Sequence, residues 1–114
     1  LSKRSSSFST KIAYENAQLD LDQKKSRVYM EIMNARMTVL ADQSIKTATE
    51  KQLDANKMVY EIEQEKYELG ASNLLNVSIA QRDYIETSLK LVKTEYKLMY
   101  DNYALSYYLG NSRF

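Results

Sequence analysis

Few side chains in this sequence could do chemistry, and their arrangement argues against an active site. There is no cysteine and no histidine, so thiol nucleophiles, thiolate metal sites and the commonest general base are absent. Met30, Met33 and Met37 could bind Cu(I) or Ag(I) through their thioethers, but their helical spacing on an apolar stripe favours packing. Four glutamates would spread around a helix beside lysines, which is typical of a solvated face: Glu61, Glu63, Glu65 and Glu68. We therefore predict no catalytic residue, no metal site, no cofactor and no enzymatic activity.

The composition indicates long helices. The 114 residues include no proline and two glycines, so the chain can make very few reversals. Sixteen basic and fifteen acidic residues give a net charge of +1, which does not point to a nucleic-acid partner. No apolar run approaches the roughly 18 residues of a membrane span. We expect no contact of this segment with a membrane.

Gly70 is the one strong helix breaker inside the chain. A glycine directly after Leu69 can end a helix in the left-handed region, and Ser72 or Asn73 can cap the next one. We expect a frayed start over Leu1–Thr10, a first helix from about residue 8 to 69, a turn at about 70–73, and a second helix from about 73 to 109. Gly110 and Asn111 would end the second helix as Gly70 ends the first. The predicted fold is all-α, a single domain over residues 1–114 formed by a long antiparallel helical hairpin, or coiled coil, with unequal arms.

Both predicted helices carry two apolar stripes. On the first, residues 28–41 hold two stripes on nearly opposite faces: Val28, Ile32, Ala35 and Val39, and Met30, Met33, Met37 and Leu40. From residue 45 a single stripe is expected: Ile45, Ala48, Gln52, Ala55, Val59, Ile62, Lys66 and Leu69. The second helix carries Ile85, Leu89, Val92, Tyr96, Met99 and Tyr103, and a seven-residue repeat of Val77, Tyr84, Leu91, Leu98 and Leu105. Two apolar faces predict neighbours on both sides, as in one wall element of an α-barrel. They also predict that the isolated chain self-associates or packs its spare faces in a crystal lattice.

Equal counting away from Gly70 sets the expected register. It places Tyr103 beside about Met37 and Tyr108 beside about Ile32. Residues before about 28 would overhang without a partner helix in this chain.

The turn region resembles the signature of the outer-membrane efflux (TolC-type) family. That signature is Y-x-x-G, five residues, Asp or Asn before Val, and then A-Q; here it runs from Tyr67 to Gln81. The context agrees, with KIAYENAQLDLDQKK at residues 11–25 and a closing Tyr107-Tyr108-Leu109-Gly110-Asn111. The resemblance spans nearly the whole chain and is greatest to the second, C-terminal, of the family's two repeats, as a fragment without the membrane strands.

This resemblance implies a passive conduit. Members of the family are trimers with a β-barrel in the outer membrane of Gram-negative bacteria and a long α-barrel in the periplasm. Their hairpin tips dock on a periplasmic adaptor, or membrane fusion protein, which links to an inner-membrane pump to complete a tripartite efflux system. By resemblance, the adaptor-docking tip comprises Leu69, Gly70, Ala71, Ser72 and Asn73.

The same resemblance gives a candidate pore entrance. Many members carry an aspartate before the valine and another three residues later, which ring the closed periplasmic entrance and select cations. Here these positions hold Asn76 and Ile79, so the acidic gate is not preserved. Asp83 lies one helical turn beyond Ile79 and could supply a displaced acidic ring, although a solvated helix-face charge is the simpler interpretation.

Two other functions fit a helical hairpin. One is a self-contained coiled-coil scaffold or interaction module, which the two-sided apolar pattern and the order of motifs disfavour. The other is the hairpin of the periplasmic adaptor itself, whose Arg/Leu/Ser tip pattern this turn lacks.

Overall fold

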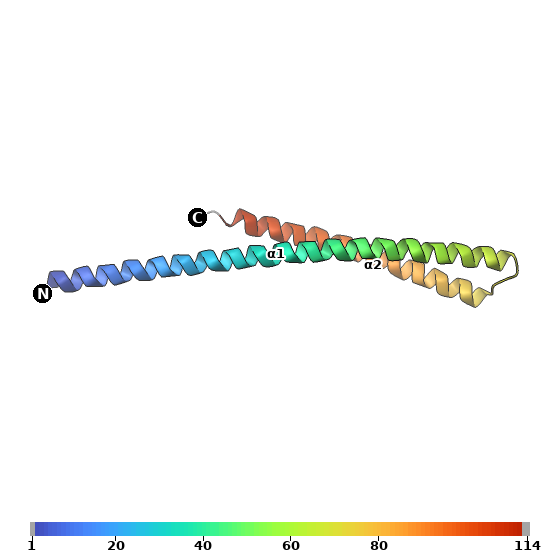
Figure 1. Ribbon diagram of the computed structural model, residues 1–114, viewed down its shortest axis with the longest axis horizontal. Helices are drawn as coiled ribbons and strands as arrows, with labels where there is room; N and C mark the ends of the chain where they lie inside the picture. Colours follow the sequence, from blue (N-terminus) through green and yellow to red (C-terminus); the bar gives the residue numbers. More distant parts are fainter. Residues whose placement is uncertain (1, 113–114) are drawn as a thin grey trace.

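The computed structural model describes residues 2–112 as two antiparallel helices (Figure 1). Helix α1 (Ser2–Glu68) has 67 residues and helix α2 (Leu74–Gly110) has 37. The molecule measures 102 × 20 × 14 Å, so it is a rod without a globular core. The described residues contain no strand. This confirms the predicted all-α helical hairpin with unequal arms.

Helix α1 begins earlier than predicted. The expected fraying before Phe8 is wrong for the described residues, because the chain is helical from Ser2; Leu1 lies outside the described residues. No proline or glycine interrupts this stretch, and serine and threonine hydroxyls can bond back to the preceding turn. Thr10 does so, donating from Oγ1 to the Ser6 carbonyl at 2.9 Å.

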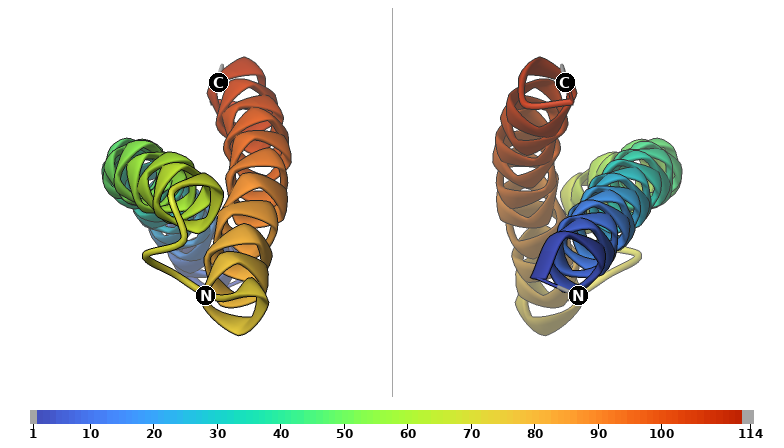
Figure 2. Two further views of the ribbon diagram at one scale, coloured as in Figure 1. Left: turned by 90° about the vertical axis from the view of Figure 1, so that its right-hand side faces the viewer. Right: turned by 90° about the vertical axis from the view of Figure 1, so that its left-hand side faces the viewer.

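The two helices meet along a seam with a seven-residue repeat. In α1 the buried and half-buried residues recur at alternating spacings of four and three, the heptad pattern of coiled coils. The α1 seam comprises Val28, Ile32, Ala35, Val39, Asp42, Lys46, Thr49, Leu53, Asn56, Tyr60 and Glu63. The α2 seam comprises Val77, Ala80, Tyr84, Thr87, Leu91, Thr94, Leu98, Asp101, Leu105 and Tyr108. Figure 2 shows that the helices cross obliquely along this seam.

The observed register agrees with counting from the turn. The rings of Tyr60 and Tyr84 stack with centroids 5.9 Å apart, and Tyr108 shares a groove with Glu31 and Ala35, which is where the count places it. Every residue from 2 to 27 is exposed, so the N-terminal third of α1 extends past α2 as an overhang (Figure 1).

The stripe expected from Ile45 to Leu69 is not the seam. Ile45, Val59, Ile62 and Leu69 are exposed. The seam continues instead through Lys46, Leu53 and Tyr60, and through polar residues at seven-residue intervals after Ala35: Asp42, Thr49, Asn56 and Glu63. The apolar stripe was therefore the wrong choice of seam in this part of α1. In a left-handed supercoil the contact face is set by the strict seven-residue repeat, and here that repeat carries polar residues.

The end of α2 also differs from the prediction. Gly110 belongs to the helix, and Gly70 is the only described residue with a positive φ. Asn111 caps α2 with φ −88° and ψ 0°, and its amide donates to the Tyr107 carbonyl at 3.1 Å. The Asn111 amide thus bonds carbonyls in the last turn of α2, and no glycine in the left-handed conformation is needed there.

Candidate functional site

The hairpin tip is a turn of defined backbone geometry. Gly70 has φ +76°, the left-handed conformation predicted from its position. Its amide donates to the Tyr67 carbonyl at 3.1 Å, and the Ala71 amide donates to the Lys66 carbonyl at 2.7 Å. This pair of bonds is the Schellman motif, which satisfies carbonyls that the end of a helix leaves free. The chain therefore reverses at one fixed point.

Two polar side chains hold the far side of the turn. Asn73 is the N-cap of α2, and its side-chain oxygen accepts from the Asn76 amide at 2.8 Å. Ser72, the other capping candidate, instead donates to Oε2 of Glu63 at 2.6 Å, and Lys66 lies 3.7 Å from the same carboxylate. The turn is thereby tied to the last two turns of α1.

The tip presents apolar side chains to solvent. Leu69 is 78% exposed, and Leu74 and Leu75 are exposed beside it. Ala71 is also exposed, whereas Ser72 is half-buried. Leu74 and Leu75 were not among the predicted tip residues. The sequence could have indicated them, because they are an apolar pair in the first turn of the second helix and lie outside its heptad seam. The predicted tip thus gains a flanking leucine surface.

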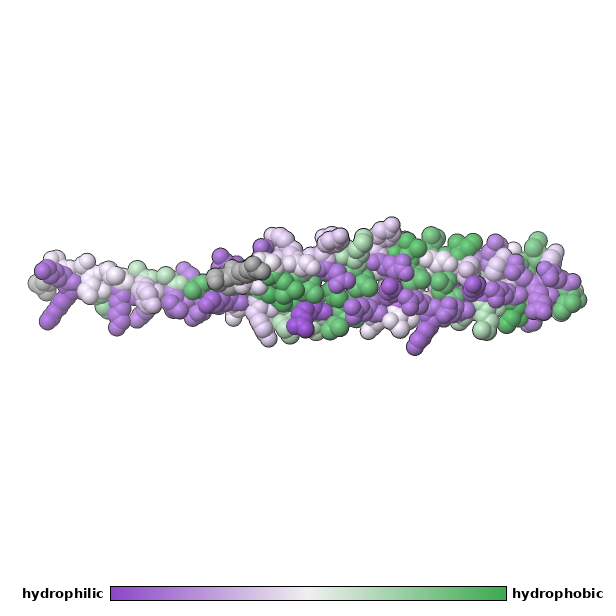
Figure 3. All heavy atoms as spheres, turned by 90° about the horizontal axis from the view of Figure 1, so that it is seen from above, coloured by the Kyte–Doolittle hydropathy of each residue, from purple (hydrophilic) through white to green (hydrophobic). Residues whose placement is uncertain are grey.

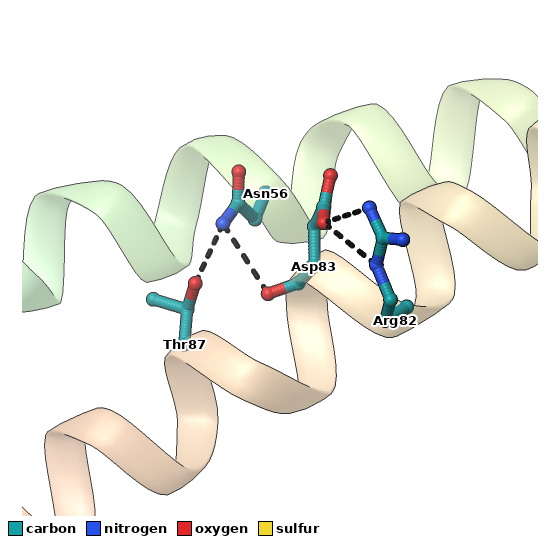
Figure 4. Close-up of polar contacts among 4 residues, drawn as sticks. All are labelled: Asn56, Arg82, Asp83 and Thr87. Atoms are coloured by element: carbon teal, nitrogen blue, oxygen red, sulfur yellow. Dashed lines mark hydrogen bonds and ion pairs between the residues drawn. The ribbon is translucent and has the colours of Figure 1, made fainter.

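The three candidate pore-entrance residues differ in their surroundings. Asn76 and Ile79 are exposed. Asp83 is half-buried beside the seam, where its Oδ1 lies 3.2 Å from Nη2 of Arg82 (Figure 4). Its backbone carbonyl accepts from Nδ2 of Asn56 at 3.4 Å. The neighbouring guanidinium partly offsets the charge of this carboxylate.

An ionic cluster inside the hairpin was not predicted. Nζ of Lys97 lies 2.9 Å from Oδ1 of Asp42 and 2.8 Å from Oδ2 of Asp101. Hydrogen bonds to Asp101 and then to Asp42 raise the pKa of Lys97. Interaction with the Asp42 carboxyl, followed by the hydrogen bond from Lys97, lowers the pKa of Asp101. The sequence signal was an aspartate at a seam position of each helix, with a lysine one helical turn before Asp101.

Both helices expose apolar residues outside the seam. We call this set of residues the outer stripe: Met30, Met33, Met37, Leu40, Ile45, Val59 and Ile62 of α1, with Ile85, Leu89, Val92, Tyr96, Met99 and Tyr103 of α2, all exposed. In the seam, by contrast, only Val39 and Ala80 are buried apolar residues, whereas Asp42, Thr49, Thr87 and Thr94 are buried and polar. Figure 3 shows apolar atoms on the surface of the two-helix part of the rod.

The two potential ligand sets lie on different parts of α1. Met30, Met33 and Met37 lie exposed on the outer stripe. Of the four glutamates near the tip, Glu63 faces the seam and bonds Ser72, while the others are exposed. Within residues 2–112, no three acidic side chains are grouped so as to hold a metal ion.

Comparison with known families identifies the chain. A family model described as outer membrane efflux protein matches residues 2–111, and the chain therefore belongs to the outer membrane efflux protein family. Neither a comparison with curated proteins nor one with solved structures finds a match. Neither described helix is long and apolar enough to cross a membrane.

Membership assigns the broad role of the chain. The family consists of conduits rather than enzymes, so the chain is a component of an outer-membrane efflux channel. Members generally form trimers and work with adaptors. In the hairpin, the features that such a role can use are the fixed tip and the outer stripe.

Proposed function

We propose that this chain is a wall segment of the periplasmic α-barrel of an efflux duct, and that its tip docks a periplasmic adaptor of a tripartite pump. The full-length protein would act as a homotrimer and as a passive conduit. Family membership supports the channel role. The observation that carries the docking role is the exposed tip built on Gly70.

The tip suits contact with another backbone. Gly70 has no Cβ, and an added one would meet no heavy atom within 4 Å, so the space beside it is open. Exposed Ala71 is also small, and small residues allow a partner chain to approach closely. Leu69, Leu74 and Leu75 would add apolar contact around this point.

The outer stripe supports the wall role. A hairpin standing alone gains nothing from keeping its most apolar residues in water, whereas a hairpin between neighbours buries them. Asn76, Ile79 and Asp83 lie in the first turns of α2 after the tip, the end of the wall that would face the adaptor. We assign them to the pore entrance as part of this proposal.

The test uses the full-length parent protein with Ala71→Trp. A bulky side chain on the outside of the turn should leave folding intact, because the site is exposed, but should block close approach of an adaptor. Ala71→Ser, which keeps a small side chain, is the matched control. The outer-membrane level is measured by blot and efflux by accumulation of a fluorescent substrate.

Lost efflux at a normal protein level in Ala71→Trp, with normal efflux in Ala71→Ser, supports docking at this tip. Normal efflux in both variants would contradict it. A scaffold hairpin predicts no export phenotype from either change.

A further inference from the structure

The deepest positions of the seam are polar, and two side-chain contacts join the helices there. Nζ of Lys97 donates to Oδ1 of Asp42 at 2.9 Å, and Nδ2 of Asn56 donates to Oγ1 of Thr87 at 2.7 Å (Figure 4). Asp42 is 3% exposed and Thr87 is 5% exposed. Polar groups at buried coiled-coil positions cost stability and can specify which register the helices adopt.

The two contacts belong to equivalent layers of the hairpin. Asp42 lies beside Lys97 and Asp101. Asn56 lies beside Asp83 and Thr87. In each layer one α1 residue meets two α2 residues one helical turn apart, and the layers are separated by two heptads in both helices. If α2 slid along α1 by one heptad, Asp42 and Asn56 would therefore each face the equivalent heptad positions of α2, seven residues away from their present partners.

The sequence repeats one donor and one acceptor at heptad spacing. Lys90 precedes Lys97 by seven residues, and Thr94 follows Thr87 by seven. If α2 slipped one heptad away from the tip, Asp42 would meet Lys90, but Asn56 would lose Thr87 and meet Ala80. If α2 slipped toward the tip, Asn56 would meet Thr94, but Asp42 would meet Ala104 and lose its ammonium partner.

Each contact alone thus fits two registers, and only the observed register satisfies both. We propose that the Asp42–Lys97 and Asn56–Thr87 pairs together form a register lock that aligns α1 and α2 independently of the turn. The hairpin tip is then free to deform, or to vary in sequence, without the helices slipping.

Oδ2 of Asp42 is consistent with such a role. It is buried without a hydrogen-bond partner, and a seam selected for stability alone would place an apolar side chain at this position.

The test removes the turn and measures the register. In the full chain, residues 69–73 are replaced by a Gly/Ser linker of about 20 residues, which spans roughly 25 Å and so permits a one-heptad slip of about 10 Å. Spin labels are attached at Gln18→Cys and Asn102→Cys, both exposed positions in a chain without other cysteines. Pulsed dipolar EPR, with labelled chains diluted in unlabelled ones, reads the distance between them, roughly 30 Å along the helix axis.

The lock predicts shifts of opposite sign. The linker variant with an intact seam should keep one distance, equal to that of the parent turn. Asp42→Ala in the linker variant should add a population about 10 Å longer, because Asn56 can then bond Thr94. Asn56→Ala should add a population about 10 Å shorter, because Asp42 can then pair with Lys90. Thr49→Ala is the matched control, since Thr49 is buried in the seam but its hydroxyl donates to the Ile45 carbonyl of its own helix; it should shift nothing.

Two results would overturn the proposal. Slipped distances with an intact seam would show that the turn alone sets the register. Unchanged distances in both alanine variants would show that the apolar seam residues set it. Circular dichroism checks that each variant is helical. If Asp42→Ala is not, Lys97→Met replaces it and should shorten the distance, because Lys90 is then the only lysine in that heptad series; an unchanged distance would again contradict the lock.

Discussion

The Ser72 hydroxyl donates a 2.6 Å hydrogen bond to Oε2 of Glu63, nine residues earlier in the chain. This contact joins the loop at the end of the hairpin (Figure 1) back to α1. The Glu63 side chain is only 21% exposed, so the bond is partly shielded from water. The tip is therefore held by a side chain as well as by the backbone bonds of Gly70 and Ala71.

Ser72→Ala should lower the free energy of unfolding by about 0.5–1.5 kcal/mol, the usual net value of one hydrogen bond. Urea denaturation monitored by circular dichroism measures it. Glu63→Ala, which removes the acceptor, and the double variant complete a double-mutant cycle. If the two changes are additive within 0.3–0.5 kcal/mol, as distant sites are, the contact contributes nothing and this prediction is wrong.

Gly70→Ala should destabilise the hairpin by roughly 1 kcal/mol, because an L side chain is strained at φ +76°. The added Cβ meets no neighbour within 4 Å, so the cost comes from backbone conformation alone. Gly110→Ala is the control: its site is equally open but helical, and alanine there should stabilise by up to about 1 kcal/mol. Equal effects of the two substitutions in urea denaturation would contradict the account of the turn.

The isolated chain should self-associate through the outer stripe. Burying about 400 Å² of apolar surface is worth on the order of 10 kcal/mol before ordering costs. Leu89→Lys, at the centre of the α2 part of the stripe, should shift sedimentation velocity toward the 13.3 kDa monomer. Leu74→Lys makes the same change at an exposed position of α2 outside the heptad series of Leu89 and should not. A parent chain that stays monomeric at millimolar concentration would contradict the prediction.

The ionic cluster should contribute stability over a defined pH range. The pKa of Asp101 is lowered from its ordinary 3.8, so its contribution is present above that pH and is lost as pH falls through the lower folded value. The pKa of Lys97 is raised above 10.5, so its contribution is present below that pH and is lost as pH rises through the higher folded value.

Asp101→Asn tests the loss of stability at acid pH. The thermal midpoint of the variant should fall below that of the parent at pH 6, and the difference should shrink as the pH drops below 3.8. Salt at 1 M should also reduce the difference, because Lys97 is largely exposed. A difference that stays constant down to pH 2 would exclude an ionic origin.

The hairpin was predictable because one residue controls it. Gly70 is the only glycine far from the chain ends and there is no proline, so the reversal had one available place and counting from it predicted the register. The stripe of Val28, Ile32, Ala35 and Val39 was confirmed as seam for the same reason, since these residues are apolar and follow the heptad.

The polar half of the seam could not be found from hydropathy. Beyond Val39 the α1 seam passes through Asp42, Thr49 and Asn56, while more apolar residues occupy another face. Extending the heptad from Ala35 would have reached them, but only the partner helix explains why Asp42 and Asn56 are tolerated, since Lys97 bonds Asp42 and Thr87 bonds Asn56. Side-chain partners 31 and 55 residues away in sequence are invisible to a local pattern.

The overhang of α1 gives the chain a gradient of local stability. From residue 2 to 27 every side chain is exposed, so those backbone hydrogen bonds are protected by the helix alone, without packing against α2. Amide hydrogens in this segment will exchange with solvent through fraying from the N-terminus, whereas those around Val39, Asp42 and Thr49 will wait for the helices to separate. A protease added to the hairpin will therefore cut first among residues 2–27 and leave the paired section intact.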